Sequence, residues 1–253
     1  MTVNVTLKES LEESIYRPTP ARIVSVEDIG PAEKLYVVSL PGGMSLNHEP
    51  GQFVELSVFG VGEAPISISS SPSRSNGAFE LCVRRVGDVT TALHAMKPGD
   101  VVGIRGPFGR PFPLKSFQGK DILFVVGGLS LAPVRSVINQ MIDERGKYGK
   151  MMILYGARTP ADLLFKHELK EWEERPDVEL HVTVDRADEE WTGNVGVITT
   201  LFPKVQVYAR NTVAIIEGPP VMYRYALMEV LGKGIPEGNI WFSFERRMKC
   251  GVG

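Results

Sequence analysis

The segment Phe124–Pro133, FVVGGLSLAP, places an apolar run directly before two glycines and a second apolar run directly after them. The first run has the composition of a buried strand, and the second opens a stretch with helical spacing. A buried strand, a tight glycine turn and a helix N-terminus together form an anion site, because backbone N–H groups point out of the turn. The segment therefore predicts that a dinucleotide pyrophosphate binds at Gly127 and Gly128.

On the N-terminal side of this segment, short β-rich stretches alternate with turn residues. Strands are expected over 21–26, 34–40, 52–58, 66–70, 79–86 and 101–105, with one short helix over 90–96. Many short strands at even spacing are typical of a small antiparallel barrel.

On the C-terminal side, strands alternate with helices. The strands are expected over 121–126, 151–155, 178–184, 212–216 and 239–244, and the helices over 131–145, 161–173, 194–201 and 221–231. This alternation predicts a doubly wound parallel sheet. The expected fold is thus an antiparallel β barrel followed by an α/β domain, with a nucleotide bound where they meet.

The composition sets limits on location and partners. A length of 253 residues suffices for two modest domains, and the net charge of -2 gives no reason to expect nucleic acid as a partner. No apolar run approaches the roughly 18–20 residues that a membrane span needs. The N-terminal segment lacks the apolar core of a signal peptide, and two cysteines are too few for a disulfide framework. We therefore expect a cytoplasmic protein without a membrane span.

Two further segments of the barrel half carry candidate chemistry. Ala64–Ser69, APISIS, is either a barrel strand with outward serines or the strand along which an isoalloxazine ring lies, with the Ser67 hydroxyl near its reactive N5. Arg84–Leu93, RRVGDVTTAL, is either a capped helix with solvated arginines or a second phosphate site at Gly87, Thr90 and Thr91.

Two loops follow strands of the α/β half, at 155–158 and 217–222. Glycine and proline in such loops often serve turning alone. Open α/β sheets nevertheless bind their ligands at these strand ends, so the order of the segments favours a shared nucleotide site.

Four segments together resemble the ferredoxin–NADP reductase superfamily over about residues 20–253. They are Phe124–Pro133, YGAR at 155–158, GPPVM at 218–222 and SFERRMKCGVG at 243–253. They are most similar to the branch that holds the dihydroorotate dehydrogenase electron-transfer subunit, its counterpart in anaerobic sulfite reductase and the sulfhydrogenase gamma subunit. The resemblance implies an N-terminal arm over 1–19, an FAD-binding barrel over 20–115, an NAD(P)-binding domain over 116–245 and the start of an iron–sulfur tail over 246–253.

The resemblance also implies a role for each candidate residue. Ser67 and Glu217 are the candidate catalytic residues. The residues implied to contact FAD are Pro65, Ile66, Ser67, Ile68, Arg84, Gly87, Thr90 and Thr91. The residues implied to hold the nicotinamide dinucleotide are Gly127, Gly128, Ala132, Pro133, Gly156, Arg158, Asp185, Gly218, Pro219 and Met222.

The barrel half departs from the family pattern. The flavin motif of the family is Arg-x-Tyr/Phe-Ser, and here Ala64, Ile66 and Ser67 take those positions. The arginine and the aromatic ring are both missing, although Ile66 can pack on the flavin and either Arg84 or Arg85 can supply charge. We therefore expect FAD binding that is weaker or depends on a partner.

The α/β half has departures of its own. Ser130 replaces a glycine that is frequent in the family, and a serine there can cap the following helix. Glu217 replaces a cysteine beside the nicotinamide, where a carboxylate either favours NAD+ by Coulomb attraction, lies solvated and inert, or crowds the ring. Asp185 accepts a bond from a ribose 2′-OH and repels a 2′-phosphate, which favours NAD, while Arg186 keeps NADP possible.

The tail contains the beginning of a metal motif. In the similar branch, Cys-Gly-Val-Gly continues into further cysteines that hold a [2Fe–2S] cluster, and ligation takes four thiolates. Here Cys250 stands alone before Gly253, and Cys82 is expected to be a core residue. We expect a truncated sequence, with Cys250 as a metal ligand and the cluster present only where the chain continues.

The resemblance implies an electron-transfer oxidoreductase subunit. Hydride would pass between NAD(H), or NADP(H), and FAD, and single electrons would pass to or from an iron–sulfur partner in a hydrogenase, heterodisulfide reductase, sulfite reductase or dehydrogenase complex. The alternatives are a free-standing NAD(P)H flavin reductase and a non-enzymatic adaptor that has lost its cofactors. The sequence leaves open the terminal acceptor, the direction of electron flow and the partner subunits.

Overall fold

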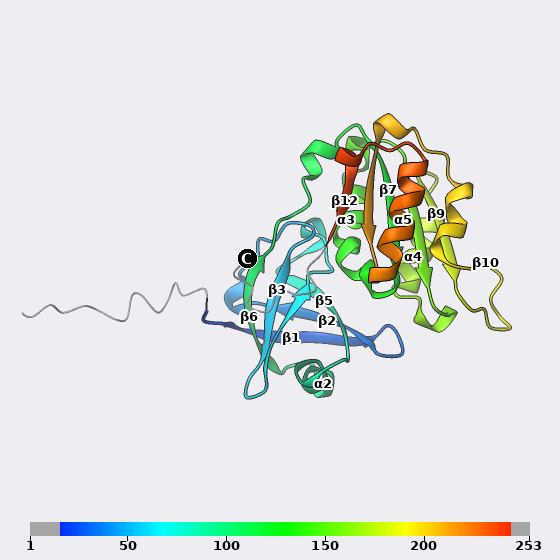
Figure 1. Ribbon diagram of the computed structural model, residues 1–253. Helices are drawn as coiled ribbons and strands as arrows, with labels where there is room; N and C mark the ends of the chain where they lie inside the picture. The colour runs from blue at the N-terminus through cyan, green and yellow to red at the C-terminus, as the bar shows by residue number, and fades with distance from the viewer. Residues whose placement is uncertain (1–15, 244–253) are drawn as a thin grey trace, which may run out of the picture.

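The computed structural model describes residues 16–243, which form two sheets side by side (Figure 1). The first sheet is antiparallel, with six strands in the order β4-β3-β6-β1-β2-β5. Their bounds are β1 Thr19–Asp28, β2 Glu33–Ser39, β3 Phe53–Val58, β4 Gly62–Ser67, β5 Ala78–Arg84 and β6 Val101–Phe108. A bridge between Ile68 and Leu81 joins the two edges of this sheet. The predicted antiparallel barrel is therefore confirmed, with helix α2 (Asp88–Ala95) against one end of it.

The second sheet is parallel, with six strands in the order β10-β9-β8-β7-β11-β12. Its strands are β7 Asp121–Gly127, β8 Met151–Ala157, β9 Val178–Val184, β10 Asn194–Val195, β11 Thr212–Glu217 and β12 Ile240–Phe242. The helices around it are α3 Leu131–Asp143, α4 Lys166–Glu173, α5 Pro220–Gly232 and the 3-10 helix η7 Ile198–Lys204.

The side chains of β7 point alternately into two hydrophobic cores, one on each face of the parallel sheet. All seven residues of β7 are buried. Ile122 and Phe124 point into the core that includes α3 and α4, whereas Leu123 and Val125 point into the core that includes α5 and η7. The doubly wound architecture expected from the continuous apolar run is confirmed.

The strand order has one switch point. The chain adds β8, β9 and β10 on one side of β7, and then adds β11 and β12 on the other side. The carboxyl ends of β7 and β11 consequently meet, with Glu217 opposite Val126. Such a switch point is where open α/β sheets bind ligands.

Three expected elements differ in the structure. The helix expected over 194–201 forms only from Ile198 onward, as the 3-10 helix η7. Before it, β10 runs along β9, where Gly196 has φ +132 and the Asn194 amide donates to the Val182 carbonyl at 2.8 Å. The helix expected over 161–173 begins only at Lys166, since Phe165 adopts a left-handed conformation. The strand expected over 66–70 ends at Ser67 and extends toward Gly62 instead.

Among residues 16–243, none of the helices combines the length and the apolar composition that crossing a bilayer requires.

Candidate functional site

A cleft of about 1030 Å³ lies between the barrel and the carboxyl ends of the parallel strands. Segments from both domains line it, and it brings together most of the site residues predicted from the sequence. These are Pro65, Ile66, Ser67, Arg84, Thr90, Gly127, Gly128, Ala132, Pro133, Gly156, Arg158, Asp185, Glu217, Gly218, Pro219 and Met222.

A buried tyrosine, Tyr155, fixes the glycine turn after β7 by hydrogen bonds. Gly128 has φ +59, a conformation that favours glycine. The Tyr155 hydroxyl donates to the Gly128 carbonyl at 3.3 Å and accepts from the Leu164 N–H at 3.2 Å. Burial raises the pKa of Tyr155, so the phenol keeps the proton that this bond needs. The turn therefore has one defined shape.

Two glycines allow the loops after β7 and β11 to touch. A Cβ on Gly127 would lie 2.7 Å from Met222 Sδ and 2.9 Å from Pro219 Cδ. A Cβ on Gly218 would lie 2.6 Å from Met222 Sδ. Side chains at these positions would fill a floor that is now backbone, and a bare backbone floor beside a helix N-terminus fits a pyrophosphate.

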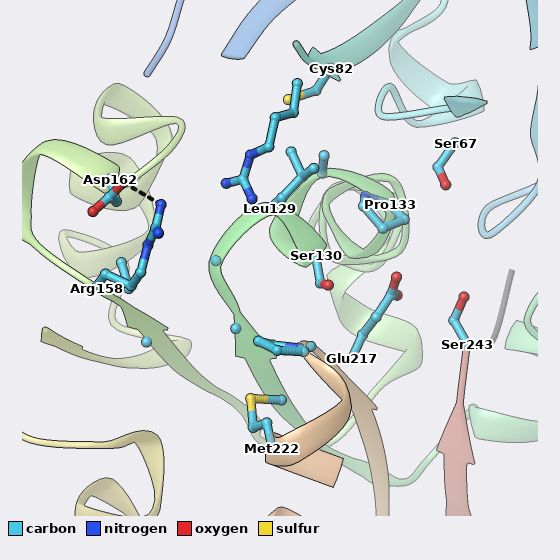
Figure 2. A pocket seen from close by; sticks show the side chains of 18 of the residues that line it. Ser67, Cys82, Leu129, Ser130, Pro133, Arg158, Asp162, Glu217, Met222 and Ser243 are labelled. Atoms are coloured by element: carbon cyan, nitrogen blue, oxygen red, sulfur yellow. Dashed lines mark hydrogen bonds and ion pairs between the residues drawn. The ribbon is translucent and has the colours of Figure 1, made fainter. Parts of the chain in front are cut away.

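The expectation that Ser130 caps helix α3 is wrong. Ser130 has helical φ and ψ, and its side chain makes no capping hydrogen bond. The cause is a 3-10 turn over Gly128–Ser130, which starts the helical path before α3 itself. In Figure 2 the Ser130 hydroxyl lies at the cleft.

One end of the cleft carries an ion pair (Figure 2). Arg158 Nη2 lies 3.3 Å from Asp162 Oδ1, and the Thr159 hydroxyl donates to Asp162 Oδ2 at 2.7 Å. Asp185 also lines the cleft. Arg186 is not among the lining residues, and its backbone N–H donates to the Arg158 carbonyl at 2.9 Å. This end therefore offers one guanidinium and two carboxylates.

Hydroxyl and carboxylate oxygens gather at the other end. Ser67, Glu217 and Ser243 all line the cleft there, away from Arg158 (Figure 2). Glu217 is buried, with 8% of its surface exposed. Ser67 ends β4, which is an edge strand, so the polypeptide along Ala64–Ser67 borders the cleft directly.

The positive charge on the barrel side is already paired. The Arg84 Nε donates to the buried Glu33 carboxylate. At the start of α2, the Thr90 hydroxyl accepts the N–H groups of Val86 and Gly87 at 2.9 and 3.0 Å. The side chain of Thr90 thus bonds back to the backbone before the helix, as in one half of a capping box, while the N-cap residue Gly87 makes no side-chain cap.

Three predicted residues within the described part of the chain are not brought into the cleft. Ile68 packs in the barrel core with 1% of its surface exposed, because its bridge to Leu81 turns it inward. Gly87 and Thr91 lie at the start of α2 but do not line the cleft. Cys250 lies outside the described residues.

The cleft also contains residues that the sequence analysis missed. They are Cys82, Leu129, Asp162, Ile198, Thr199, Tyr225 and Ser243, among others. Cys82 could have been found from strand alternation, since it lies two residues before Arg84. Asp162 could have been found from the Thr-x-x-Asp spacing that starts at Thr159, which is a common capping pattern. Burial raises the pKa of the Cys82 thiol to about 12, so it is not a thiolate at neutral pH.

The described part of the chain contains no group of three or more His, Cys, Asp or Glu side chains able to hold a metal ion. The cleft is instead suited to organic cofactors, since it has backbone turns, small side chains and few unpaired charges.

Comparison with known proteins agrees with this geometry. The profile of the oxidoreductase FAD-binding domain matches residues 20–112, and that of the oxidoreductase NAD-binding domain matches residues 124–227. The chain is 39% identical to the sulfhydrogenase 2 subunit gamma of Pyrococcus furiosus, over 94% of this chain and 87% of the relative. It is 31% identical to a probable dihydroorotate dehydrogenase B (NAD(+)) electron transfer subunit of Methanocaldococcus jannaschii, over 94% and 81% of the two chains.

A solved structure shares the fold. The cytochrome b5 reductase domain of Ulva prolifera nitrate reductase superposes with a TM-score of 0.76, over 90% of this chain and 98% of that domain, at 21% identity. The predicted order of an FAD-binding domain followed by an NAD-binding domain is confirmed.

Proposed function

The chain belongs to the ferredoxin–NADP reductase superfamily of FAD- and NAD-binding oxidoreductases, and on that premise we propose its place in a redox complex. It is an FAD-dependent NAD(P)H oxidoreductase of the electron-transfer subunit type. We propose that NADH is its nucleotide and that its partner is an iron–sulfur subunit, as in the hydrogenase and dehydrogenase complexes that the names of its relatives indicate. One observation carries this proposal: segments of both cofactor domains line a single cleft.

The residues present fit both cofactors. Bound FAD supplies hydride exchange with the nicotinamide and release of electrons one at a time. We propose that Pro65, Ile66 and Ser67 contact the flavin, and that the Ser67 hydroxyl donates or accepts a hydrogen bond at its reactive edge. Arg84 contributes charge to the FAD phosphates to the extent that its pairing with Glu33 allows.

The sheet side would hold the dinucleotide through its backbone. We propose that Gly127, Gly128 and Gly218 leave room for the pyrophosphate, with Ala132 and Pro133 in the first turn of α3. Gly156, Pro219 and Met222 shape the same floor. A floor of glycine backbone orients the nucleotide without a long side chain, so alignment rests on fixed turns.

We propose that Arg158, Asp162 and Asp185 decide between NAD and NADP. Two carboxylates surround the one guanidinium at this end of the cleft. A 2′-phosphate would meet their repulsion, whereas a 2′-OH can donate to Asp185. The arrangement supports NAD as the preferred dinucleotide.

We propose that Glu217 shifts the balance between oxidised and reduced nicotinamide. It is a buried carboxylate in the cleft, and a negative charge favours the cationic oxidised ring over the neutral reduced one. Glu217→Cys should weaken NAD+ binding relative to NADH by about tenfold, which corresponds to roughly 1.4 kcal/mol. An unchanged ratio of the two dissociation constants, measured by calorimetry, would remove the role.

A visible spectrum tests the proposed function. The chain purified from its native source should show the absorption bands of bound flavin, and these bands should bleach on anaerobic addition of NADH. Subunits with iron–sulfur clusters should copurify and become reduced in turn. A colourless preparation that leaves NADH unoxidised would favour a non-enzymatic adaptor, and full turnover with soluble acceptors but no copurifying subunit would favour a free-standing flavin reductase.

A further inference from the structure

Helix α3 touches both halves of the molecule. Its first turn follows the Gly127-Gly128 turn directly, and polar side chains along its length bond to the barrel segment 69–74. Gln140 Oε1 accepts the Ser73 N–H at 3.2 Å, and Asp143 forms an ion pair with Arg74 at 2.7 Å. Any movement of the barrel against α3 would therefore be passed to the glycine turn.

Arg135 is the buried one among the polar side chains of α3 that bond to the barrel segment 69–74. Only 7% of its surface is exposed. Its guanidinium forms ion pairs with Glu80 and Glu168, each at 2.5 Å, and Nη1 also donates to the Ser69 carbonyl at 3.2 Å. The same guanidinium stacks 4.7 Å from the centre of the Phe165 ring.

The partners of Arg135 come from both domains. Glu168 and Phe165 belong to the α/β domain, whereas Glu80 on β5 and Ser69, two residues after Ser67, belong to the barrel. The Ser69 N–H also donates to the Glu80 carbonyl at 2.8 Å, so these two barrel residues form one unit. A planar guanidinium with fixed donor directions holds such acceptors in one arrangement, and a buried charge loses much when one partner leaves.

We propose that Arg135 and Glu80 form a positioning pair that sets the alignment of the two cofactor-binding walls. Neither residue lines the cleft. The pair acts by fixing the end of β4 against the helix that follows the glycine turn. This inference rests on the proposed function, because alignment has a consequence for rate only where hydride passes across the cleft.

Two variants separate alignment from general stability. Glu80→Gln and Glu168→Gln each remove one carboxylate charge from Arg135, but only Glu80→Gln weakens a link between the domains. In stopped-flow reduction at saturating NADH, we expect Glu80→Gln to slow flavin bleaching at least tenfold, while Glu168→Gln stays within threefold of the wild type. The dissociation constants for FAD and NADH should stay within threefold in both. Arg135→Lys, which keeps the charge but loses the planar fork, should resemble Glu80→Gln.

A cofactor-free measurement completes the test. Hydrogen exchange at the amides of residues 68–71 should become faster in the Glu80→Gln chain and not in the Glu168→Gln chain. Equal bleaching rates and equal exchange in the two variants would overturn the positioning pair. If the wild-type chain fails to react with NADH, the proposed function fails, and the exchange measurement still decides whether Glu80 holds this segment.

Discussion

The two walls of the cleft are built in different ways. The sheet wall, formed by Gly127, Gly128 and Gly218, is bare backbone, and two of these glycines, Gly127 and Gly218, pack tightly against Met222. The barrel wall, formed by Ala64–Ser67 with Arg84 and Thr90, is an edge strand whose nearby polar groups are paired within the protein. From this contrast we expect that steric fit limits cofactor binding at the sheet wall, whereas charge and the choice of side chain limit cofactor binding at the barrel wall.

A single methyl group on the sheet wall should have the largest effect. In Gly127→Ala, the new Cβ would lie 2.9 Å from Pro219 Cδ, which cannot swing away as the end of Met222 can. Relieving such overpacking costs typically about 1–3 kcal/mol, so we expect NADH binding measured by calorimetry to weaken by about tenfold to 100-fold. FAD binding should stay unchanged. Gly146→Ala is the matched control, because a Cβ there meets nothing within 4 Å; equal affinity in both variants would show that the sheet wall is not limited by packing.

Charge at the far end of the sheet wall should matter next. Asp185→Ser removes the carboxylate expected to meet the ribose, and Asp162→Asn releases Arg158 from its ion pair. Each change should lower the ratio of the NADPH to the NADH dissociation constant by about tenfold, or roughly 1.4 kcal/mol. Asp188→Asn changes the net charge equally but does not line the cleft. A ratio that moves as much in this control would assign the effect to the overall field of the protein.

The barrel wall should instead gain from an added side chain. Ala64→Arg restores the arginine of the family flavin motif at a position that borders the cleft. Because the Arg84 charge is shared with Glu33, a new cation should tighten FAD binding about fivefold, in the range of roughly 1 kcal/mol for a partly exposed charge. Val24→Arg, also in the barrel but outside the cleft, should leave the affinity unchanged. An unchanged FAD affinity in Ala64→Arg would mean that positive charge does not limit FAD binding at the barrel wall.

The sheet wall was predictable from the sequence, and the reason is local. The continuous apolar run of β7 and the two glycines after it occupy adjacent positions, so one stretch of ten residues contains strand, turn and helix start. The switch point then follows from the alternation of strands and helices. Short patterns of this kind are informative because burial of the strand, the left-handed glycine and the helix start each depend on adjacent residues.

The barrel wall and the interdomain contacts were less predictable. Arg135 meets Glu80 and Glu168, which lie 55 and 33 residues away along the chain, and no periodicity reveals such a meeting. From the sequence, the Thr90 hydroxyl could have faced either a phosphate or the loop before α2. The folded turn shows that it accepts the Val86 N–H of that loop. The segment at Asn194 carried a helical pattern, but side-chain bonds to β9 held it extended.

The barrel also contains, outside the lining of the cleft, a buried acid with a distinct pH response. Glu55 on β3 lies opposite Pro65 of β4 and Arg105 of β6, and it is fully buried. Neither of its carboxylate oxygens has a hydrogen-bond partner among residues 16–243. Burial raises the pKa of Glu55 from 4.5 to about 7; repulsion from Glu63 adds to the rise, and the Arg105 charge opposes it.

The last expected effect is not on cofactor affinity: it is a difference in the stability of the fold, and it depends on pH. Between pH 4.5 and about 7, the folded chain keeps a proton on Glu55 that the unfolded chain has released. Stability therefore falls as the pH rises through this window and stays lower above it. Glu55→Gln preserves the shape of the neutral acid, so its melting temperature should match the wild type at pH 4.5 and exceed it at pH 8. The gain should be roughly 1–3 kcal/mol, or several degrees for a chain of this size.

The last residue of helix α3, Asp143, supplies the control for this last comparison. Asp143, which pairs with Arg74, has a pKa held below its ordinary value by that guanidinium, so Asp143→Asn should lose stability at pH 8 rather than gain it. If Glu55→Gln gains stability at pH 8 and Asp143→Asn loses it, the loss of stability of the wild type at high pH is assigned to Glu55. A loss of stability in Glu55→Gln at pH 8 would instead mean that Arg105 stabilises the ionised Glu55, and that this buried charge adds to the stability of the barrel.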